Sequence, residues 1–227
     1  MTVIPAVLSY NRPDLAEMMY DQLSGVIIFE NGTLPEKWLS LQVHCQQRYS
    51  KENLFFSGGW NWAMRELASL EDNDAVWMLN SDVQGISYEM MLELRKFMVN
   101  YDYAVISPAF NSPHAHMQVQ STDLLKPAER LRKVKWIDWT CPLVSMKAWR
   151  DVGEFDERFK GYGADVDWCF RAAQKGYRLV VSDSHECFHL GSQTALSEGL
   201  QGVQGNTAEM HRLLDEKWGP GAWSRLA

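Results

Sequence analysis

The chain alternates short apolar runs with longer stretches in which apolar residues recur at helical spacing. Apolar, β-prone runs at 3–9 and 26–29 enclose a helical pattern, which Pro13 opens and Gly25 ends. One face of this predicted helix is apolar throughout, and it consists of Leu15, Met18, Met19 and Leu23. A strand, a helix and a second strand in this order predict a β-α-β unit whose two strands are parallel.

Further apolar runs and helical patterns follow along the chain. The runs predict strands at 41–45, 75–79, 104–107, 136–146 and 177–181. Helical spacing predicts helices close to 60–67, 88–99, 147–152, 164–175 and 206–218. The run at 75–79 is almost wholly apolar, which is typical of a central strand. Alternating strands and helices, without a repeat or a linker, predict one α/β domain with a mostly parallel central sheet flanked by helices.

Glycines and polar residues mark two loops between these elements. Gly58 and Gly59 predict a turn that enters the helix starting at Trp60. Glycines at such a turn let the backbone come close to a phosphate or a sugar, although a Gly-Gly pair is more often part of a plain loop. The polar, glycine-containing stretch at 192–205 predicts a mobile loop.

Composition narrows the class of protein. The 227 residues are 46% hydrophobic, which is enough for a sizeable core and excludes global disorder. The net charge of −7 argues against a protein that coats nucleic acid, because such binding needs many Lys and Arg contacts to phosphate. The 4 cysteines lie far apart and form no C-x-x-C pair, so we expect reduced, structural cysteines instead of a zinc site or a disulfide framework.

The sequence shows no membrane segment and no leader. No apolar run approaches the ~20 residues that a membrane span needs. The first residues contain neither a charged leader region nor a cleavage site. We therefore expect a cytoplasmic protein, and for a phage-encoded enzyme this would be the cytoplasm of the host.

Polar side chains follow the predicted strands where a parallel sheet binds its ligands, at the carboxyl ends of the strands. Those ends carry the segments 9–12, 30–33 and 80–83. Asp82, after the central apolar run, could hold a hard divalent cation together with substrate phosphates. A plain turn explains the same residues equally well, because Asn, Ser and Asp all favour turns.

Two aspartates stand at the start of the predicted helix at 164–175. Asp165 and Asp167 are two positions apart, which is about 200° around a helix, so they flank the buried Val166 and face different targets. Only one of them is expected to do chemistry. Acidic residues also stabilise a helix N-terminus by complementing its dipole, so the spacing alone leaves both explanations open.

Six segments resemble, in this order, the motifs of the family 2 inverting glycosyltransferases of GT-A fold, particularly the rhamnosyltransferase-like branch. They are Tyr10-Asn11-Arg12, Glu30-Asn31-Gly32-Thr33, NLFFSGGWNWA (53–63), LNSDV (79–83), VGEFDERFKGYGADVDWCFRAAQKGYRL (152–179) and HLGS (189–192). Each segment alone is a weak signal, but six at sensible spacing span nearly the whole chain. The resemblance implies a single GT-A domain, with a nucleotide-sugar-binding half at 1–100 and an acceptor-binding half at 101–227.

The resemblance also implies roles for single residues. Those around the nucleotide base and ribose would be Tyr10, Arg12 and Glu30. Those lining the donor cleft would be Asn53, Gly58, Gly59 and Asn61. The segment Asn80-Ser81-Asp82 matches the family's D-x-D motif, whose last aspartate binds the divalent cation, Mn²⁺ or Mg²⁺, and the donor diphosphate. His189 matches a further metal ligand, and Asp165 matches the catalytic base.

Three features depart from the family pattern. Asn80 replaces the first acidic residue of D-x-D, so only one carboxylate is assured there. Ala164 stands where the family usually has Glu before the base, which points to a different acceptor. Phe55 and Trp60 replace small or polar residues of the glycine-rich segment, so we expect a narrower donor pocket.

The chemistry of glycosyl transfer agrees with these roles. An inverting transfer needs a base that takes the proton of the acceptor hydroxyl as it attacks the anomeric carbon, and a carboxylate at a cleft rim can do this. The departing nucleoside diphosphate builds up negative charge, which a divalent cation stabilises. The sequence thus predicts a metal-dependent inverting glycosyltransferase that moves a sugar from a UDP-, dTDP- or GDP-sugar to a hydroxyl of a surface polysaccharide or another glycan.

The identity of the acceptor is open, and DNA is the alternative to a glycan. A basic run lies between the donor half and Asp165, and it consists of Lys126, Arg130, Arg132, Lys133 and Lys135. Such a run is usually a solvated face, but at a cleft it could hold an anionic acceptor. A phage-type DNA glycosyltransferase acting on hydroxymethylated pyrimidines would bind the strand here and stack an indole on the base. Its acceptor residues would be Arg130, Arg132, Lys133, Trp136 and Trp139.

Two further classes fit the sequence less well. A sugar-nucleotide nucleotidyltransferase shares the parallel-sheet plan, but such enzymes have a glycine- and arginine-rich first loop, which residues 9–14 lack. A non-catalytic carbohydrate-binding relative would not need Asp82, Asp165 and His189, and their presence argues against it.

Overall fold

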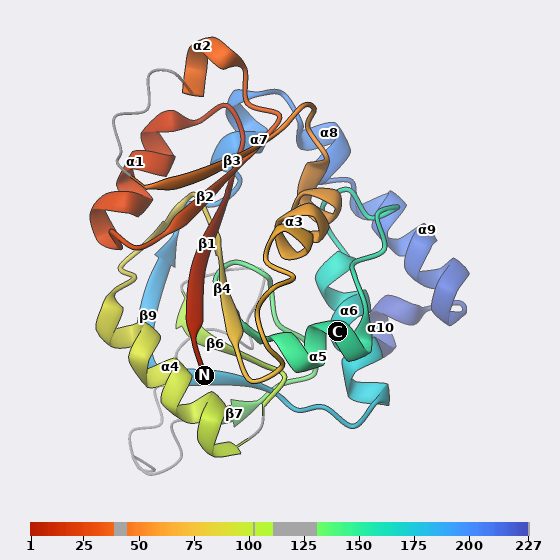
Figure 1. Cartoon of the computed structure of the whole chain (residues 1–227). Coiled ribbons are helices and arrows are strands. Elements are labelled where there is room, and N and C mark those ends of the chain that lie inside the picture. Colours follow the sequence, from red (N-terminus) through yellow and green to blue (C-terminus); the bar gives the residue numbers. More distant parts are fainter. Residues whose placement is uncertain (39–44, 102, 111–130, 227) are drawn as a thin grey trace.

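The computed structural model describes residues 1–38, 45–101, 103–110 and 131–226 (Figure 1). Its strands are β1 (Val3–Ser9), β2 (Ile27–Asn31), β3 (Gln46–Ser50), β4 (Ala75–Asn80), β5 (Val83–Gln84), β6 (Val105–Phe110), β7 (Leu131–Lys133), β8 (Leu143–Ser145) and β9 (Leu179–His189). Its helices are α1 (Pro13–Gln22), α2 (Pro35–Trp38), α3 (Phe55–Glu66), α4 (Tyr88–Tyr101), α5 (Met146–Val152), α6 (Ala164–Gln174), α7 (Gln193–Ser197), α8 (Gln201–Gln204), α9 (Thr207–Trp218) and α10 (Ala222–Leu226).

The strands form one sheet with the order β3-β2-β1-β4-β8-β6-β9-β5, and β7 pairs with β9. The first half is parallel, because β1 pairs in this way with β2 and β4, and β2 with β3. β8 then lies antiparallel between β4 and β6, whereas β6 and β9 are parallel. The predicted α/β fold is confirmed, with a sheet that is parallel in its first half and mixed in the rest.

Helices cover both faces of the sheet. In Figure 1, α1 and α4 lie on one side of the central strands, and α3, α5 and α6 lie on the other. α9 and α10 form an outer layer next to α6, and α7 lies near the carboxyl ends of β1 and β2. The central strands are buried on both faces, as the apolar run at 75–79 predicted, and residues 75–79 expose none of their surface.

The last long helix begins and ends as its sequence predicts. Asn206 precedes α9, and its Oδ1 accepts a hydrogen bond from the backbone N–H of Glu209 at 3.0 Å. Met210, Leu213 and Leu214 form the buried face of the helix. The chain then leaves the helix at Gly219.

The expected turn at Gly58 and Gly59 is wrong, because both glycines lie inside α3. The helix begins earlier, at Phe55, whose backbone N–H donates to Asn53 Oδ1 at 2.8 Å. Gly59 faces the sheet, and a Cβ at this position would lie 2.8 Å from Asn31 Nδ2 and 2.9 Å from Leu8 Cδ2. The glycine therefore lets α3 pack closely on β1 and β2.

The expected strand at 136–146 is confined to its last part, β8. Pro142 has no N–H for a ladder, and its carbonyl accepts from Met78 N at 2.9 Å. Upstream, the hydroxyl of Thr140 donates to Asp138 Oδ1 at 2.7 Å, which turns the chain locally. The run is apolar because Ile137 and its neighbours are buried, not because they are extended.

Two other expected segments differ from the structure. The predicted mobile loop at 192–205 contains the short helices α7 and α8. The predicted strand at 41–45 lies almost entirely outside the described residues, and β3 begins just after it. Within the part of the chain that the structure describes, none of the helices has both the length and the apolar character needed to cross a membrane.

Candidate active site

The carboxyl ends of β1, β2 and β4 form one edge of the sheet, and the polar segments predicted from the sequence follow these ends. β1 ends at Ser9, β2 at Asn31 and β4 at Asn80. Asn80 is half-buried, and Ser81 next to it is 5% exposed. Because the strands are parallel neighbours, the three segments are brought to the same edge.

Asp82 and His189 meet beside this edge. Asp82 lies two residues after the end of β4, and His189 ends β9, which pairs with β5 so that Val83 lies opposite His189. The ring nitrogen Nε2 of His189 lies 3.1 Å from Asp82 Oδ1. The other carboxylate oxygen, Oδ2, accepts from the backbone N–H of Gln193 at 3.2 Å. The two metal ligands that the sequence predicted are therefore in contact.

Each member of this pair favours the charged form of the other. Burial opposes ionisation of Asp82, but the hydrogen bond and charge of His189 hold the pKa of Asp82 below its usual value. Burial likewise disfavours the imidazolium, but the hydrogen bond that it donates to Asp82, and the charge of Asp82, raise the pKa of His189. A carboxylate oxygen and an imidazole nitrogen fit Mn²⁺ or Mg²⁺ when phosphate oxygens complete the set. Among the described residues, no group of three or more His, Cys, Asp or Glu side chains could hold a metal ion.

Asp165 lies in the first turn of α6, on a helix start fixed by tight packing. Gly163 precedes the helix with a φ of 95°, and a Cβ there would lie 2.7 Å from Met210 Cγ. The carboxylate of Asp165 accepts from Val166 N at 2.9 Å. Burial, and then the negative charge of Asp138, raise the pKa of Asp165 to about 7. A carboxyl group with this pKa can take and release protons near neutral pH.

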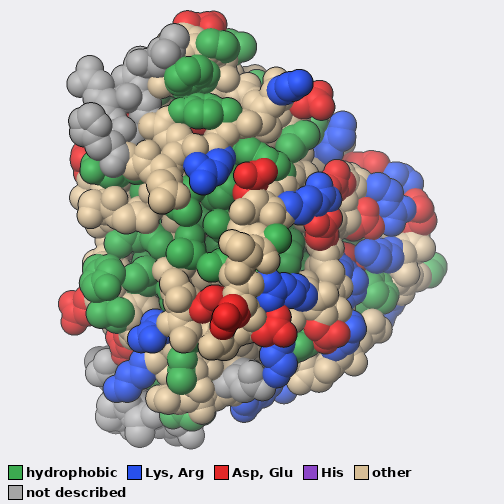
Figure 2. Space-filling model, in the orientation of Figure 1, with side chains coloured by type: hydrophobic (Ala, Val, Ile, Leu, Met, Phe, Trp, Pro, Cys, Tyr) green, Lys and Arg blue, Asp and Glu red, His purple; other side chains and the backbone are tan. Residues whose placement is uncertain are grey.

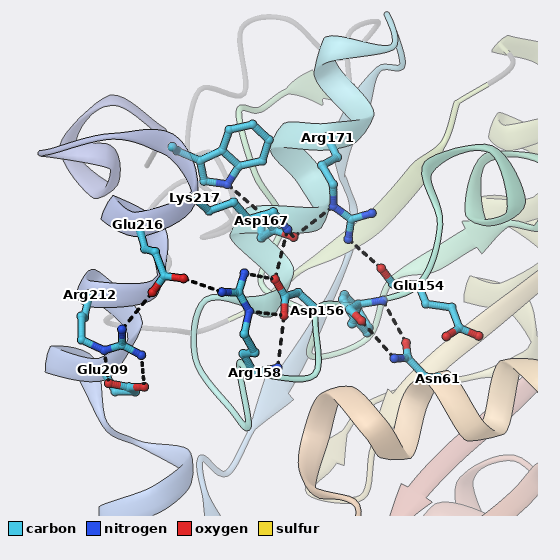
Figure 3. Close-up of polar contacts among 12 residues, drawn as sticks. Asn61, Glu154, Asp156, Arg158, Asp167, Arg171, Glu209, Arg212, Glu216 and Lys217 are labelled. Carbon is cyan, nitrogen blue, oxygen red and sulfur yellow. Dashed lines mark hydrogen bonds and ion pairs between the residues drawn. The ribbon is translucent and has the colours of Figure 1, made fainter.

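Asp167 faces the other side of α6 and is completely buried. Its carboxylate accepts from Arg171 Nε at 3.0 Å, Lys217 Nζ at 3.0 Å and Trp218 Nε1 at 2.9 Å (Figure 3). Lys217 and Trp218 belong to the last turn of α9. Asp167 therefore joins α6, the helix that carries Asp165, to α9.

A wider set of ion pairs surrounds this junction. Figure 3 shows Arg158 between Asp156 and Glu216, and Arg212 between Glu209 and Glu216. In Figure 2, acidic and basic side chains are interspersed on the side where α9 lies. The pairs that Arg212 forms with Glu209 and Glu216, and Arg158 with Glu216, are exposed, so each contributes little to stability compared with the buried contacts of Asp167.

The predicted donor residues lie at the ends of β1 and β2. Glu30 is 1% exposed, and burial raises its pKa even though the hydroxyl of Thr33 donates to Oε2. Tyr10 is half-buried beside the end of β1. Arg12 follows it, and its guanidinium donates to Asp14 from Nε at 2.8 Å and from Nη2 at 2.7 Å.

Side-chain amides connect this edge to the start of α3. Asn31 Nδ2 donates to Asn53 Oδ1 at 3.2 Å, and Asn31 Oδ1 accepts from Leu54 N at 2.9 Å. Asn53, predicted to line the donor cleft, is thus fixed to the end of β2. Asn31 is a contributor that the sequence did not single out, although it lies within the matched segment at 30–33.

Asn61, Gly58 and Gly59 contact protein groups instead of an open cleft. Asn61 is 1% exposed, and its Oδ1 accepts from Phe155 N at 2.9 Å while its Nδ2 donates to Phe155 O at 3.0 Å. Nδ2 also donates to Glu157 Oε1 at 2.9 Å. These contacts hold α3 against the loop that leads to α6.

The residues predicted to bind the acceptor differ in how deeply they are buried and in the side chains that they contact. Trp139 is 1% exposed and packs edge-on against Trp168 at 5.1 Å, so its ring offers no face for stacking. Trp136 is 8% exposed and packs near Trp223. The basic positions on β7 also differ from each other. Arg132 is paired with Asp183 at 2.6 Å, Lys133 is exposed, and Arg130 lies outside the described residues.

A pocket of about 250 Å³ lies next to the start of α6. The loop 158–162 forms one wall, and residues of α8 and α9 form the other. Phe159, Met210 and Leu213 provide buried apolar lining, whereas Tyr162 is 49% exposed. An exposed aromatic ring beside a polar rim suits a sugar, which presents both apolar faces and hydroxyl groups.

Two carboxylates near the candidate site, Asp138 and Glu198, lie outside the motifs that the sequence offers. Asp138 is a carboxylate inside the apolar run at 136–146, and charged residues are rarely placed among buried neighbours without a role. Glu198, beyond α7, accepts from Asn11 Nδ2 at 2.8 Å and from Lys37 Nζ at 2.9 Å. It ties the chain after α7 to the loop after β1 and to α2, and no sequence pattern predicts this long-range contact.

The order of the strands and the helices on both faces of the sheet match a known architecture: the chain has the fold of the GT-A glycosyltransferases. Among solved structures, the mannosyltransferase PcManGT from Pyrobaculum calidifontis in complex with GDP-Man and Mn²⁺ matches with a TM-score of 0.64 and 14% identity. The match covers 99% of this chain and 67% of that chain.

Two curated relatives show what the sequence is similar to. One is the low-salt glycan biosynthesis hexosyltransferase Agl10 of Haloferax volcanii, which is 24% identical over 81% of this chain and 65% of its own length. The other is the N-acetylglucosaminyl-diphospho-decaprenol L-rhamnosyltransferase of Mycobacterium tuberculosis, 30% identical over 51% of this chain and 36% of its own length. No family model matches the chain. The chain thus spans less than two thirds of these relatives, and their names agree with the resemblance to family 2 glycosyltransferases.

Proposed function

We propose that this protein is a metal-dependent inverting glycosyltransferase that moves a sugar from a nucleotide diphosphate donor to a hydroxyl group of a glycan. The observation that carries the proposal is the contact of Asp82 with His189, 107 residues apart in the sequence, at the end of β4. Asp165, whose pKa is raised to about 7, supplies the base that such a transfer needs. The two relatives named as sugar transferases support the same activity.

In this proposal, Asp82 and His189 hold a divalent cation together with the donor diphosphate. A bound Mn²⁺ or Mg²⁺ would neutralise the charge that develops on the departing nucleoside diphosphate. Asp82 also keeps the start of α7 close, through the backbone N–H of Gln193. Asn80 and Ser81 lie beside Asp82 and would contact the same end of the donor.

The nucleotide would lie along the ends of β1 and β2, where Tyr10, Arg12 and Glu30 are found. Asn53 would bound this subsite on the α3 side, because Asn31 fixes it there. Gly58, Gly59 and Asn61 would act indirectly, by holding α3 in place. The complex of PcManGT with GDP-Man and Mn²⁺ supports a nucleotide sugar and a divalent cation as ligands of this fold.

Asp165 would take the proton of the acceptor hydroxyl while that oxygen attacks the anomeric carbon from the side opposite to the diphosphate. The acceptor would approach through the pocket beside Tyr162, which adjoins the start of α6. A glycan suits this pocket, and one relative is named for glycan biosynthesis. A DNA acceptor is not favoured, because Trp139 is packed in the core and Arg132 is paired with Asp183.

The proposal is tested with a panel of UDP-, dTDP- and GDP-sugars, each measured by thermal shift with and without Mn²⁺. A ligand that binds only the folded protein raises its melting temperature, so the true donor should do so in the presence of Mn²⁺. Asp82→Asn should abolish the Mn²⁺-dependent part of the shift. Asp72→Asn, which changes a surface carboxylate paired with Arg150, serves as the matched control and should keep it. If no nucleotide sugar stabilises the protein, the proposed function is wrong.

A further inference from the structure

The segment 136–142 bridges the two halves of the candidate site. On one side, the backbone N–H of Ile137 donates to Cys169 Sγ at 3.4 Å, so this end of the segment is attached to α6. On the other side, the backbone N–H of Asn80 donates to the carbonyl of Thr140 at 2.9 Å, which attaches that end to β4. The segment therefore connects the helix of the candidate base to the strand of the candidate metal site.

Asp138 lies in the middle of this bridge. Its neighbours Ile137 and Trp139 are 0% and 1% exposed, so packing fixes the backbone on both sides of it. Its carboxylate is half-buried, and Oδ1 accepts from the hydroxyl of Thr140 at 2.7 Å. Thr140 itself is completely buried. The charged group is thus held in one place by the segment that carries it.

The negative charge of Asp138 acts on the candidate base. After burial, it is the main cause that raises the pKa of Asp165. Hydrogen bonds place the two groups on the same side of α6: Ile137, next to Asp138, donates from its backbone N–H to Cys169 Sγ, and Cys169 lies one turn after Asp165. At its other end, the bridge binds the backbone of Asn80, two residues before the candidate metal ligand Asp82. Asp138 therefore lies on the segment that connects the candidate base with the candidate metal site.

We propose that Asp138 is a positioning residue of the active site, which faces Asp165 with a fixed negative charge during the transfer. The inference rests on the proposed function, because it gives Asp138 a part in proton transfer to Asp165. An ordinary aspartate, with a pKa of about 3.9, is a weak base at neutral pH. A second carboxylate nearby makes the first hold a proton more firmly, which makes it a stronger base for a hydroxyl proton.

The other titratable groups around α6 do not oppose the ionisation of Asp165 in the way that Asp138 does. Asp167 faces away from Asp165 and is neutralised by its own basic partners. Cys169 lies one turn further along the helix, and burial raises the pKa of its thiol, which keeps it uncharged. Within the described residues, Asp138 is the charged side chain that raises the pKa of Asp165.

The test measures ionisation of Asp165 directly, in the full-length protein with Mg²⁺ and without substrate. Carbon-13 NMR of aspartate-labelled protein follows the carboxyl signals with pH, and the Asp165→Asn variant assigns the signal of Asp165. The wild-type midpoint should lie near pH 7. Asp138→Asn keeps an oxygen for the hydroxyl of Thr140 but removes the charge, so the midpoint should fall by about one pH unit or more. Asp138→Glu, which keeps the charge, should stay closer to the wild type.

A kinetic readout separates this role from a structural one. The rate should fall as the pH drops below the pKa of Asp165, because the base must be unprotonated. In Asp138→Asn, the pH at which the rate falls should move lower, together with the NMR midpoint of Asp165. The KM for the acceptor should stay unchanged. Asp72→Asn removes a surface charge and should change neither the pH dependence of the rate nor the KM for the acceptor.

An Asp165 midpoint that is the same in Asp138→Asn and in the wild type overturns the inference. An acceptor KM that rises while the pH profile stays fixed also overturns it, because Asp138 would then be a binding residue. A midpoint that shifts as expected, in a protein that transfers no sugar, would support the position of Asp138 and contradict the proposed function alone.

Discussion

The two sides of the first turn of α6 carry the same side chain in different surroundings. On the side of α9, Asp167 is fully buried and accepts bonds from Arg171 and Lys217. On the other side, Asp165 accepts from a backbone N–H and faces the negative charge of Asp138. The first carboxylate is neutralised by cations, and the second is opposed by a like charge.

This difference gives the two aspartates of one helical turn different roles: Asp167 holds α6 to α9, and Asp165 is the candidate base. A buried carboxylate that binds cationic side chains of another element holds the two elements together. A like charge nearby raises the pKa of a carboxyl group toward neutral pH, and a group with such a pKa can act as a base there. Spacing along the helix sends the two side chains to different sides, and the elements packed there decide what each one does.

Asp165→Asn should have the largest effect on activity. The amide cannot take the proton of the acceptor, so the transfer rate should fall by about 10²–10⁴-fold. Stability should change little, because the amide oxygen can still accept from Val166 N. Initial rates at saturating donor, with thermal unfolding of the same samples, measure both. Normal turnover by this variant would remove Asp165 from the role of base.

Asp167→Asn should have the largest effect on stability. It leaves Arg171 and Lys217 without their buried counter-charge, so the free energy of unfolding should fall by about 3 kcal/mol. Denaturant titration measures the loss, and the transfer rate per folded molecule should stay within a few-fold of the wild type. A fully stable variant with lost activity would contradict the separation of the two sides.

Gly59→Ala should have a smaller effect, on the donor side of the molecule. The new methyl group would lie 2.8 Å from Asn31 Nδ2, so α3 or Asn31 must move, at a cost of about 1–3 kcal/mol. Because Asn31 fixes Asn53, donor affinity should weaken as well. Gly25→Ala is the matched control, since no atom lies within 4 Å of its added Cβ. Equal unfolding midpoints for the two variants would contradict this packing role.

Glu209→Gln should have the smallest effect. Glu209 pairs with Arg212 on the exposed face of α9, and solvent screens such pairs strongly. Denaturant titration should find no measurable change in stability, in contrast to Asp167→Asn on the inner face. A loss as large as that of Asp167→Asn would show that the outer ion pairs, and not the buried carboxylate, hold α9.

Local patterns predicted much of the fold. The period of apolar residues located β1, α4 and α9, because each buries one face or both faces against the core. It failed at 136–142, where the residues are apolar because they are buried in a turn. It also failed at Gly58 and Gly59, since a close helix-to-sheet contact needs glycine just as a turn does.

The site was predictable to the extent that it follows motifs. The pairing of Asp82 with His189 came from the resemblance, because no local pattern connects residues 107 apart. For the two aspartates at the start of α6, the sequence predicted only that one of them is functional. It did not predict the partners of Asp165 and Asp167. The partners that decide between them come from distant segments: Asp138 precedes α6, and Lys217 lies on α9.

The most direct test of this account is the double variant Asp165→Asn/Asp167→Asn, measured for transfer rate and for free energy of unfolding beside the two single variants. Effects at independent sites add, so the double variant should combine the rate loss of Asp165→Asn with the stability loss of Asp167→Asn. If Asp167→Asn alone loses activity as completely as Asp165→Asn while it remains folded, the two sides of α6 are not separate and the account is contradicted.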